Sequence, residues 1–152
     1  MSANRESLHD TGRVTTMTSH FDVDSIADIG TAELPLKVNG QALPGVFVTL
    51  AGPEHPTRKA FAIDKARRMR KQLARTGKIE LDDPLEEQED ETQHMVACVL
   101  AWRGIARAGK PLECTRENVL ALMSDPGKGW FRRAIKEAYE DVENFIQRSV
   151  AP

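Results

Sequence analysis

Apolar residues alternate with other residues in two short segments of the first third of the chain, a period typical of half-buried β-strands. The alternating positions are Leu34, Leu36 and Val38, followed by Val46, Val48 and Leu50. The turn formers Asn39-Gly40 and Pro44-Gly45 lie between the two segments, and Gly52-Pro53 follows the second. The pattern predicts a β-hairpin, which must pack on a helix or pair with another chain because a lone hairpin is only marginally stable.

The apolar period then becomes helical. Apolar residues recur at steps of four, three and four residues, so they share one narrow helix face. They are Ala62, Ala66, Met69 and Leu73. The remaining faces carry six cations and no acid between Lys65 and Arg75. We therefore predict a basic amphipathic helix from about Thr57 to Arg75, with Gly77 as its stop.

An acidic helix is predicted next. Asp83-Pro84-Leu85-Glu86 combines an N-cap residue, a Pro at the first helical position and an early acid, which suits the positive end of the helix dipole. The apolar stripe continues through Leu85, Met95, Val96, Val99, Trp102 and Ala106. We therefore expect one continuous helix from Asp83 that ends at Gly109, a favourable C′ residue.

Two further helices complete the pattern. Thr115 can cap the third helix, and Asp125-Pro126-Gly127 breaks it. The apolar residues of the third helix are Val119, Leu120, Leu122 and Met123. The last helix shows the clearest amphipathic period of the chain. Its apolar residues are Phe131, Ala134, Ile135, Ala138, Val142, Phe145 and Ile146.

The predicted fold class is α+β, with an N-terminal β-hairpin followed by a mainly helical domain of about four helices. Residues 1–20 are polar and aperiodic and predict a disordered N-terminal arm. Residues 21–152 predict a single domain, divided into a β-hairpin region (21–55) and a helical region (56–150). A chain of 152 residues is long enough to form one substantial core.

Composition narrows the classes of function. The formal net charge of −2 predicts neither a general nucleic-acid binder nor a membrane-surface protein. No apolar run approaches the roughly 18 residues that span a bilayer, and the first twenty residues lack the apolar region of a secretory signal. Cys98 and Cys114 have no CxxC spacing and are expected to be reduced, buried thiols. These observations predict a cytoplasmic protein with no membrane partner.

No motif of the chain predicts catalysis, a cofactor or a metal. The segment from Gly104 to Lys110 matches most of a P-loop spacing, but Pro111 replaces the Ser or Thr that holds magnesium, and no strand is expected before Gly104. Glu91 and His94 lie three residues apart on a predicted helix, but no second copy of this unit completes a carboxylate-bridged metal site. No Ser or Cys has the local context of a hydrolase nucleophile. We therefore expect a protein that is not an enzyme.

The basic segment and the large apolar residues are candidates for contacts with proteins. Contact with solvent or with acids, either in the run Glu80–Glu91 or on a partner, is favoured over nucleic acid because only Phe61 lies beside the segment to stack on bases. The candidate electrostatic contacts are Arg67, Arg68, Arg70 and Lys71. The candidate protein-interaction residues are Trp102, Trp130, Phe131, Val142, Phe145 and Ile146. The pattern leaves open whether these apolar residues form core or interface.

A series of short motifs in the C-terminal half resembles the tail assembly chaperones of long-tailed bacteriophages. The series covers roughly Leu85 to Ile146 and follows an acidic helix start. Its motifs are Val99-Leu-Ala-Trp102-Arg-Gly104-Ile, Gly109-Lys-Pro-Leu112, Cys114-Thr115-Arg-Glu117-Asn118-Val-Leu120, and a helix ending in Asn144-Phe145. In the family, the first motif is expected on a helix, the second in a loop and the third at the start of a helix. The order of the motifs carries the resemblance.

The resemblance implies a morphogenesis factor of the bacterial host cytoplasm that is absent from the finished particle. It implies that the chain binds the tape-measure protein, keeps its apolar segments soluble and helps to recruit tail-tube subunits. It carries over no catalytic residue. We also expect self-association, with the stripe from Phe131 to Ile146 as the leading candidate surface. Two alternatives stay open, a structural protein of the tail or head–tail junction and a small nucleic-acid-binding regulator.

Overall fold

The computed structural model describes residues 19–79 and 83–149, so most of the predicted N-terminal arm lies outside the described residues. The described residues divide into two compact units, a smaller one at 19–27 with 148–149 and a larger one within 28–147. The described part mixes helices with antiparallel strands, which confirms the α+β class. In the smaller unit, Asp22 caps the 3₁₀ helix η1 (Val23–Ser25), and the amide of Ser149 donates a hydrogen bond to Ser25 O over 2.8 Å.

The predicted hairpin is confirmed and consists of β2 (Thr31–Val38) and β3 (Gln41–Ala51), which pair antiparallel. Asn39-Gly40 forms the turn, with φ angles of 52° and 82°. Two positive φ angles define the type I′ turn that suits the twist of a hairpin. The prediction that Pro44-Gly45 also lies in the turn is wrong, because β3 continues through both residues. The register shifts there, and Gly45 takes a φ of 74°.

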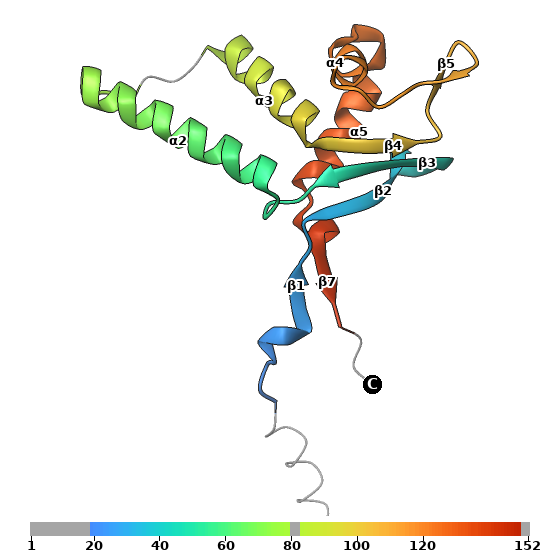
Figure 1. Cartoon of the computed structure of the whole chain (residues 1–152), viewed down its shortest axis with the longest axis horizontal. Helices are drawn as coiled ribbons and strands as arrows, with labels where there is room; N and C mark the ends of the chain where they lie inside the picture. The colour runs from blue at the N-terminus through green and yellow to red at the C-terminus, as the bar shows by residue number, and fades with distance from the viewer. Residues whose placement is uncertain (1–18, 80–82, 150–152) are drawn as a thin grey trace, which may run out of the picture. The chain divides into compact units, whose positions relative to one another are not determined.

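The segment after the acidic helix is the main correction. Helix α3 (Pro84–Cys98) ends where β4 (Val99–Arg103) begins, so the expected continuous helix to Gly109 is wrong. β4 pairs antiparallel with β3, and Trp102 lies opposite Val48 in the sheet β2-β3-β4 (Figure 1). The apolar spacing of this segment fits a helix and a short buried strand equally well. Pairing with β3 decides between them.

A second hairpin follows β4, where the helix was expected to continue. It consists of β5 (Ala106–Arg107) and β6 (Lys110–Pro111), with φ angles of 52° and 78° at the turn residues Ala108 and Gly109. Gly109 is therefore a turn residue and not a helix cap. A strand does precede Gly104, so that ground for rejecting a P-loop is wrong. The hairpin nevertheless stands where a P-loop requires a helix.

The helix boundaries agree with the capping signals in three places. α2 (Pro56–Thr76) ends at Gly77, whose φ of 74° is left-handed. The side chain of Asp83 accepts a hydrogen bond from Leu85 N at the start of α3, over 3.0 Å. Thr115 caps α4 (Arg116–Ser124) in the same way through Asn118 N. The 3₁₀ helix η2 (Pro126–Lys128) follows α4, which confirms the predicted break.

The last helix is shorter than the apolar period predicts. α5 (Gly129–Glu140) stops before Asp141, whose side chain accepts a hydrogen bond from Glu143 N and caps the 3₁₀ helix η3 (Val142–Phe145). A short Asp side chain competes for backbone donors in this way and interrupts helices. β7 (Ile146–Arg148) follows and forms a two-stranded sheet with β1 (Ile26–Asp28).

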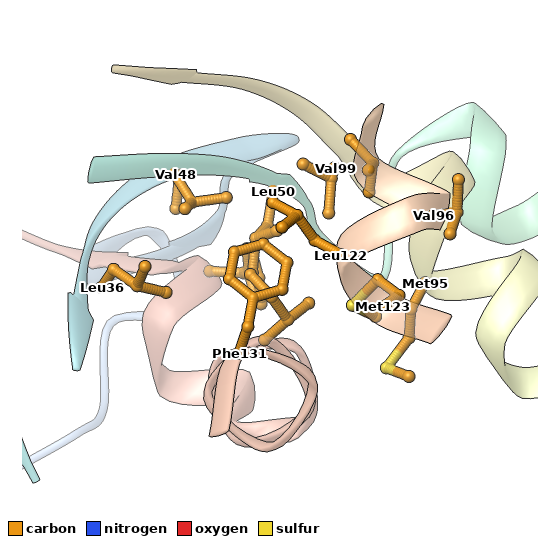
Figure 2. Packing of buried hydrophobic residues seen from close by; sticks show 13 residues of the cluster. Leu36, Val48, Leu50, Met95, Val96, Val99, Leu122, Met123 and Phe131 are labelled. Carbon is orange, nitrogen blue, oxygen red and sulfur yellow. The ribbon is translucent and has the colours of Figure 1, made fainter. Parts of the chain in front are cut away.

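The core of the larger unit lies between the sheet β2-β3-β4 and the helices α3, α4 and α5 (Figure 2). The strands contribute apolar residues from one face, and the helices contribute residues such as Met95, Leu122 and Phe131. The strand residues labelled in Figure 2 are Leu36, Val48, Leu50 and Val99. This layer fixes the positions of the surfaces around it.

Candidate protein-interaction surfaces

An apolar pocket of about 220 Å³ lies beside the β5–β6 hairpin and the start of α5. We call it the Trp130 pocket. Its apolar lining residues include Leu36, Leu43, Val46, Ile105, Leu112 and Trp130. Trp130 is half-buried, and its ring meets buried Phe131 edge-on with ring centroids 5.9 Å apart. The size and apolar lining of this pocket suit contact with apolar side chains.

Short hydrogen bonds hold the walls of the Trp130 pocket in place. The indole N–H of Trp102 donates to Leu112 O over 2.7 Å, and the amide of Leu112 donates to Ile105 O over 2.9 Å. Trp102 also meets Phe131 edge-on at 6.2 Å. The Trp102-to-Ile105 and Gly109-to-Leu112 motifs are therefore joined to each other beside one pocket. Both Trp residues are candidate interaction residues from the sequence, but the sequence does not predict this pocket.

Helix α2 is the second surface, because none of its 21 residues is buried. The predicted apolar face, here called the α2 stripe, consists of Ala62, Ala66, Met69 and Leu73. All four are exposed, with Met69 41% and Leu73 45% accessible to solvent. Ile63 lies beside the stripe and is 51% exposed. The predicted helix is confirmed, and its apolar face lacks a partner within the described residues.

A cluster of side chains attaches the start of α2 to the rest of the larger unit. The Arg58 guanidinium donates to the carbonyl oxygens of Ala51 (3.3 Å) and Tyr139 (3.2 Å), and it lies 3.8 Å from the centre of the Tyr139 ring. Phe61 stacks on His94 of α3 with ring centroids 3.8 Å apart. The hydroxyl of Tyr139 lies 3.0 Å from Nδ1 of His94.

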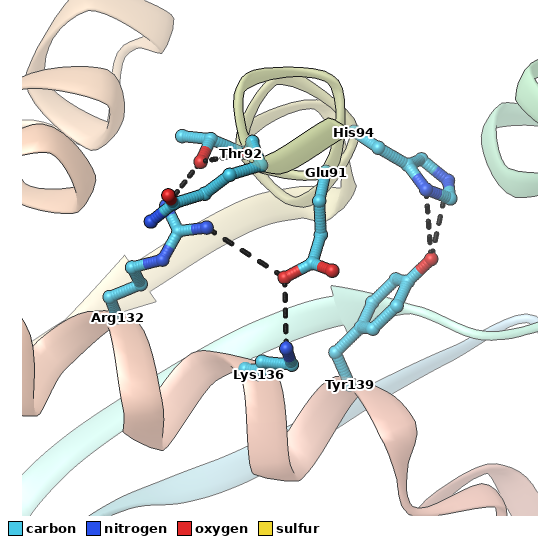
Figure 3. Close-up of polar contacts among 7 residues, drawn as sticks. Glu91, Thr92, His94, Arg132, Lys136 and Tyr139 are labelled. Carbon is cyan, nitrogen blue, oxygen red and sulfur yellow. Dashed lines mark hydrogen bonds and ion pairs between the residues drawn. The ribbon is translucent and has the colours of Figure 1, made fainter. Parts of the chain in front are cut away.

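Polar contacts also join α3 to α5 (Figure 3). The Glu91 carboxylate lies 3.1 Å from Lys136 Nζ and 3.7 Å from an Arg132 guanidinium nitrogen. Arg132 also donates to the Thr92 hydroxyl. Figure 3 shows that Glu91 and His94 engage different partners on α5, so the pair considered as half of a metal site serves to pack two helices. Within residues 19–79 and 83–149, no group of three or more metal-ligating side chains could hold an ion.

The burial of His94 leads to a prediction about pH. Burial, followed by the charges of Arg58 and Lys65, lowers the pKa of His94 below its ordinary value near 6.5. Between the lowered pKa and about 6.5 the unfolded chain binds more protons than the folded chain, so the free energy of unfolding should rise with pH across that window. It should fall as the pH drops through the same window.

Urea denaturation between about pH 5 and pH 7 measures this effect. His94→Gln should remove the ionisable ring and flatten the dependence of stability on pH. A slope that is unchanged in His94→Gln would show that the His94 ring does not couple the fold to pH.

Among the described residues, Arg68 is the cation of the basic segment that forms an ion pair with an acid of the run Glu80–Glu91. Arg68 lies 3.5 Å from Asp90 and 3.4 Å from Asp64, and all three side chains are largely exposed. Such exposed pairs contribute little stability. Arg67, Arg70, Lys71 and Arg68 all lie on exposed positions of α2. Residues 80–82 of the acidic run lie outside the described part.

The structure separates the predicted apolar contacts into core and surface residues. Phe131 and Phe145 are 2% and 1% exposed, so these two candidates, for which the sequence left core and interface open, lie in the core. Val142 is 55% exposed, and Ile146 is half-buried in β7. The stripe from Phe131 to Ile146 does not form one helix face, because α5 ends at Glu140.

A groove of about 540 Å³ is the third surface, and we call it the α3–α4 groove. Leu85 from α3 and Leu120 and Met123 from α4 provide apolar surface, while Glu89 and Asp125 contribute carboxylates. Leu85 is 73% exposed, so the apolar stripe of α3 extends beyond the core. Leu85, Leu120 and Met123 lie on the helices that the sequence predicts, but their spacing could not show that they share a groove.

Both thiols are free, as expected, and Cys98 is buried while Cys114 is only partly buried. Burial raises the pKa of the Cys98 thiol to about 11, so it is protonated at neutral pH and a poor nucleophile.

Across the described residues, no helix combines the length and apolar character needed to cross a bilayer. Comparison with known families, characterised proteins and solved structures finds no significant match to this chain.

Proposed function

We propose that the chain is a tail assembly chaperone of a long-tailed bacteriophage, which binds the tape-measure protein and helps to recruit tail-tube subunits. It acts by binding proteins and not by catalysis. The proposal rests on the order of the motifs between Val99 and Leu120 and on one structural observation. The first motif departs from the family pattern, because it begins on the strand β4 and not on a helix. The Trp102-to-Ile105 and Gly109-to-Leu112 motifs contribute walls to the Trp130 pocket, and the third motif caps the helix that follows.

The chemistry of the Trp130 pocket supports this role. An unassembled tape-measure protein exposes apolar side chains, and a holding factor must cover them reversibly. The pocket offers apolar contact, with Arg107 and Lys128 among its lining residues. A half-buried Trp is a common anchor of such contacts, since it combines a large apolar surface with one polar N–H.

Co-expression with the tape-measure protein of the same genome tests the proposal. The wild-type chain should raise the soluble fraction of the tape-measure protein, and Trp130→Glu should abolish this gain because it places a carboxylate in the apolar pocket. Leu100→Glu is the matched control, since it makes a similar change at an exposed apolar residue that does not line the pocket. The soluble fraction is measured after centrifugation.

Two results would contradict the proposal. One is a tape-measure protein that precipitates equally with and without the wild-type chain. The other is detection of the chain in purified virions by mass spectrometry, which would favour a structural tail or head–tail junction protein.

A further inference from the structure

We infer that the α2 stripe of one copy docks in the α3–α4 groove of a second copy, so that the chain associates with itself through these two surfaces. This inference does not depend on the identity of the tape-measure partner. It concerns surfaces other than the Trp130 pocket, and it replaces the stripe from Phe131 to Ile146 as the surface of self-association.

The helix and the groove carry opposite charge. α2 contains eight Lys and Arg residues and a single acid, Asp64. α3 contains five carboxylates and no Lys or Arg. The α3–α4 groove itself is lined by Glu89 and Asp125, while its one cation, Arg132, is engaged by Glu91 and Thr92. A basic helix is therefore a matched occupant for this groove, and this chain carries such a helix.

The α2 of the same copy contacts a different face of α3. Phe61 and Arg68 of α2 contact His94 and Asp90, which lie four residues apart and therefore share one face of α3. The groove uses another face of α3, on which Leu85 and Thr92 lie seven residues apart. The contacts of α2 within the copy therefore leave the groove free.

The same contacts leave the α2 stripe free. Phe61 and Arg68 are each one position before a stripe residue, Ala62 and Met69, and one position turns a helix by about 100°. When Phe61 rests on His94, the stripe therefore lies to the side of the contact and does not face the α3 of its own copy. An exposed apolar face and an exposed apolar groove then remain in each copy, with complementary charge.

The side chains of the stripe suit the groove. Met69 and Leu73 supply long apolar side chains for contact with Leu85 and Leu120, and the Ala residues of the stripe let the helix backbone approach closely. Arg70 follows Ala66 by four positions and precedes Leu73 by three, so it lies beside the stripe. It is placed to meet Glu89 of the second copy.

Sedimentation velocity or light scattering of the full chain over a range of concentrations tests the inference. The wild type should form dimers or larger assemblies, and Met69→Glu should weaken association by at least about tenfold. Ala60→Glu is the matched control, because Ala60 is an exposed, uncharged residue nine positions before Met69 and so lies on the opposite side of α2. It introduces the same side chain and should leave association nearly unchanged. Circular dichroism should show that all variants keep their helices, since these residues are exposed.

A charge exchange tests the pairing itself. Arg70→Glu and Glu89→Lys should each weaken self-association, and an equimolar mixture of the two variants should recover part of it through the restored opposite charges. A wild type that stays monomeric up to its solubility limit would overturn the inference. Met69→Glu that self-associates as strongly as the wild type would overturn it too, as would a mixture of the two charge variants that does not regain self-association. The Trp130 assay measures a different surface, so none of these results changes its interpretation.

Discussion

Phe145→Ala should lower the free energy of unfolding by about 3–5 kcal/mol, the usual cost of deleting a buried aromatic ring. The side chain is 1% exposed, and it packs directly on the backbone of Gly52, where a Cβ atom would lie 2.9 Å from its ring. The backbone carbonyl oxygen of Phe145 accepts a hydrogen bond from Ile29 N over 2.9 Å. Removing the ring leaves a cavity in a region that the backbone cannot easily close.

Urea denaturation followed by tryptophan fluorescence measures this loss. Val142→Ala, three residues earlier and 55% exposed, is the control and should change stability by no more than about 0.5 kcal/mol. If Phe145→Ala kept full stability and weakened assembly instead, Phe145 would belong to an interface, and its placement in the core would be wrong.

Gly104→Ala should cost about 2–5 kcal/mol, through two effects that act together. Gly104 has a φ of 83°, a conformation that disfavours any side chain. In addition, a Cβ atom would lie only 2.0 Å from the carbonyl oxygen of Gly45, so the backbones of both residues would have to separate. This close approach occurs where the walls of the Trp130 pocket begin, so the variant should also impair holding of the tape-measure protein.

Gly109→Ala provides a control that separates the two effects. Gly109 has a similar φ of 78°, but nothing lies within 4 Å of the position that a Cβ atom would take. Its substitution should cost only about 1–2 kcal/mol, the penalty of the left-handed backbone alone. Equal denaturation midpoints for Gly104→Ala and Gly109→Ala would show that the contact with Gly45 has no energetic weight.

Local chemistry explains which elements the sequence could predict. The turn Asn39-Gly40 and the caps Asp83, Thr115 and Gly77 act within a few residues, so their signals are readable without knowledge of the fold. β4 could not be predicted in the same way. Its apolar residues continue the helical period of α3, and only the presence of β3 alongside it makes the extended form more stable.

The candidate surfaces could also be predicted only in part from the sequence. The stripe on α2 could be read from the spacing of Met69 and Leu73, but a spacing does not say whether a face is covered. The opposite problem arose at Phe145, where an apolar period continued past the end of α5 and the residue proved to be core. Trp130 could be named from the sequence as a candidate interaction residue, whereas its pocket is assembled from residues as distant in the sequence as Leu43 and Leu112.

α2 is attached to the larger unit mainly through Arg58 and Phe61, so we expect it to lose structure before the core does. A helix with no buried residue has little packing to oppose opening, so it belongs to the part of the molecule that unfolds locally while the core stays intact. A contact made through such a helix includes the entropy of ordering it, which weakens the contact and makes separation easier. The helix that would join two copies is thus also the element through which they can part.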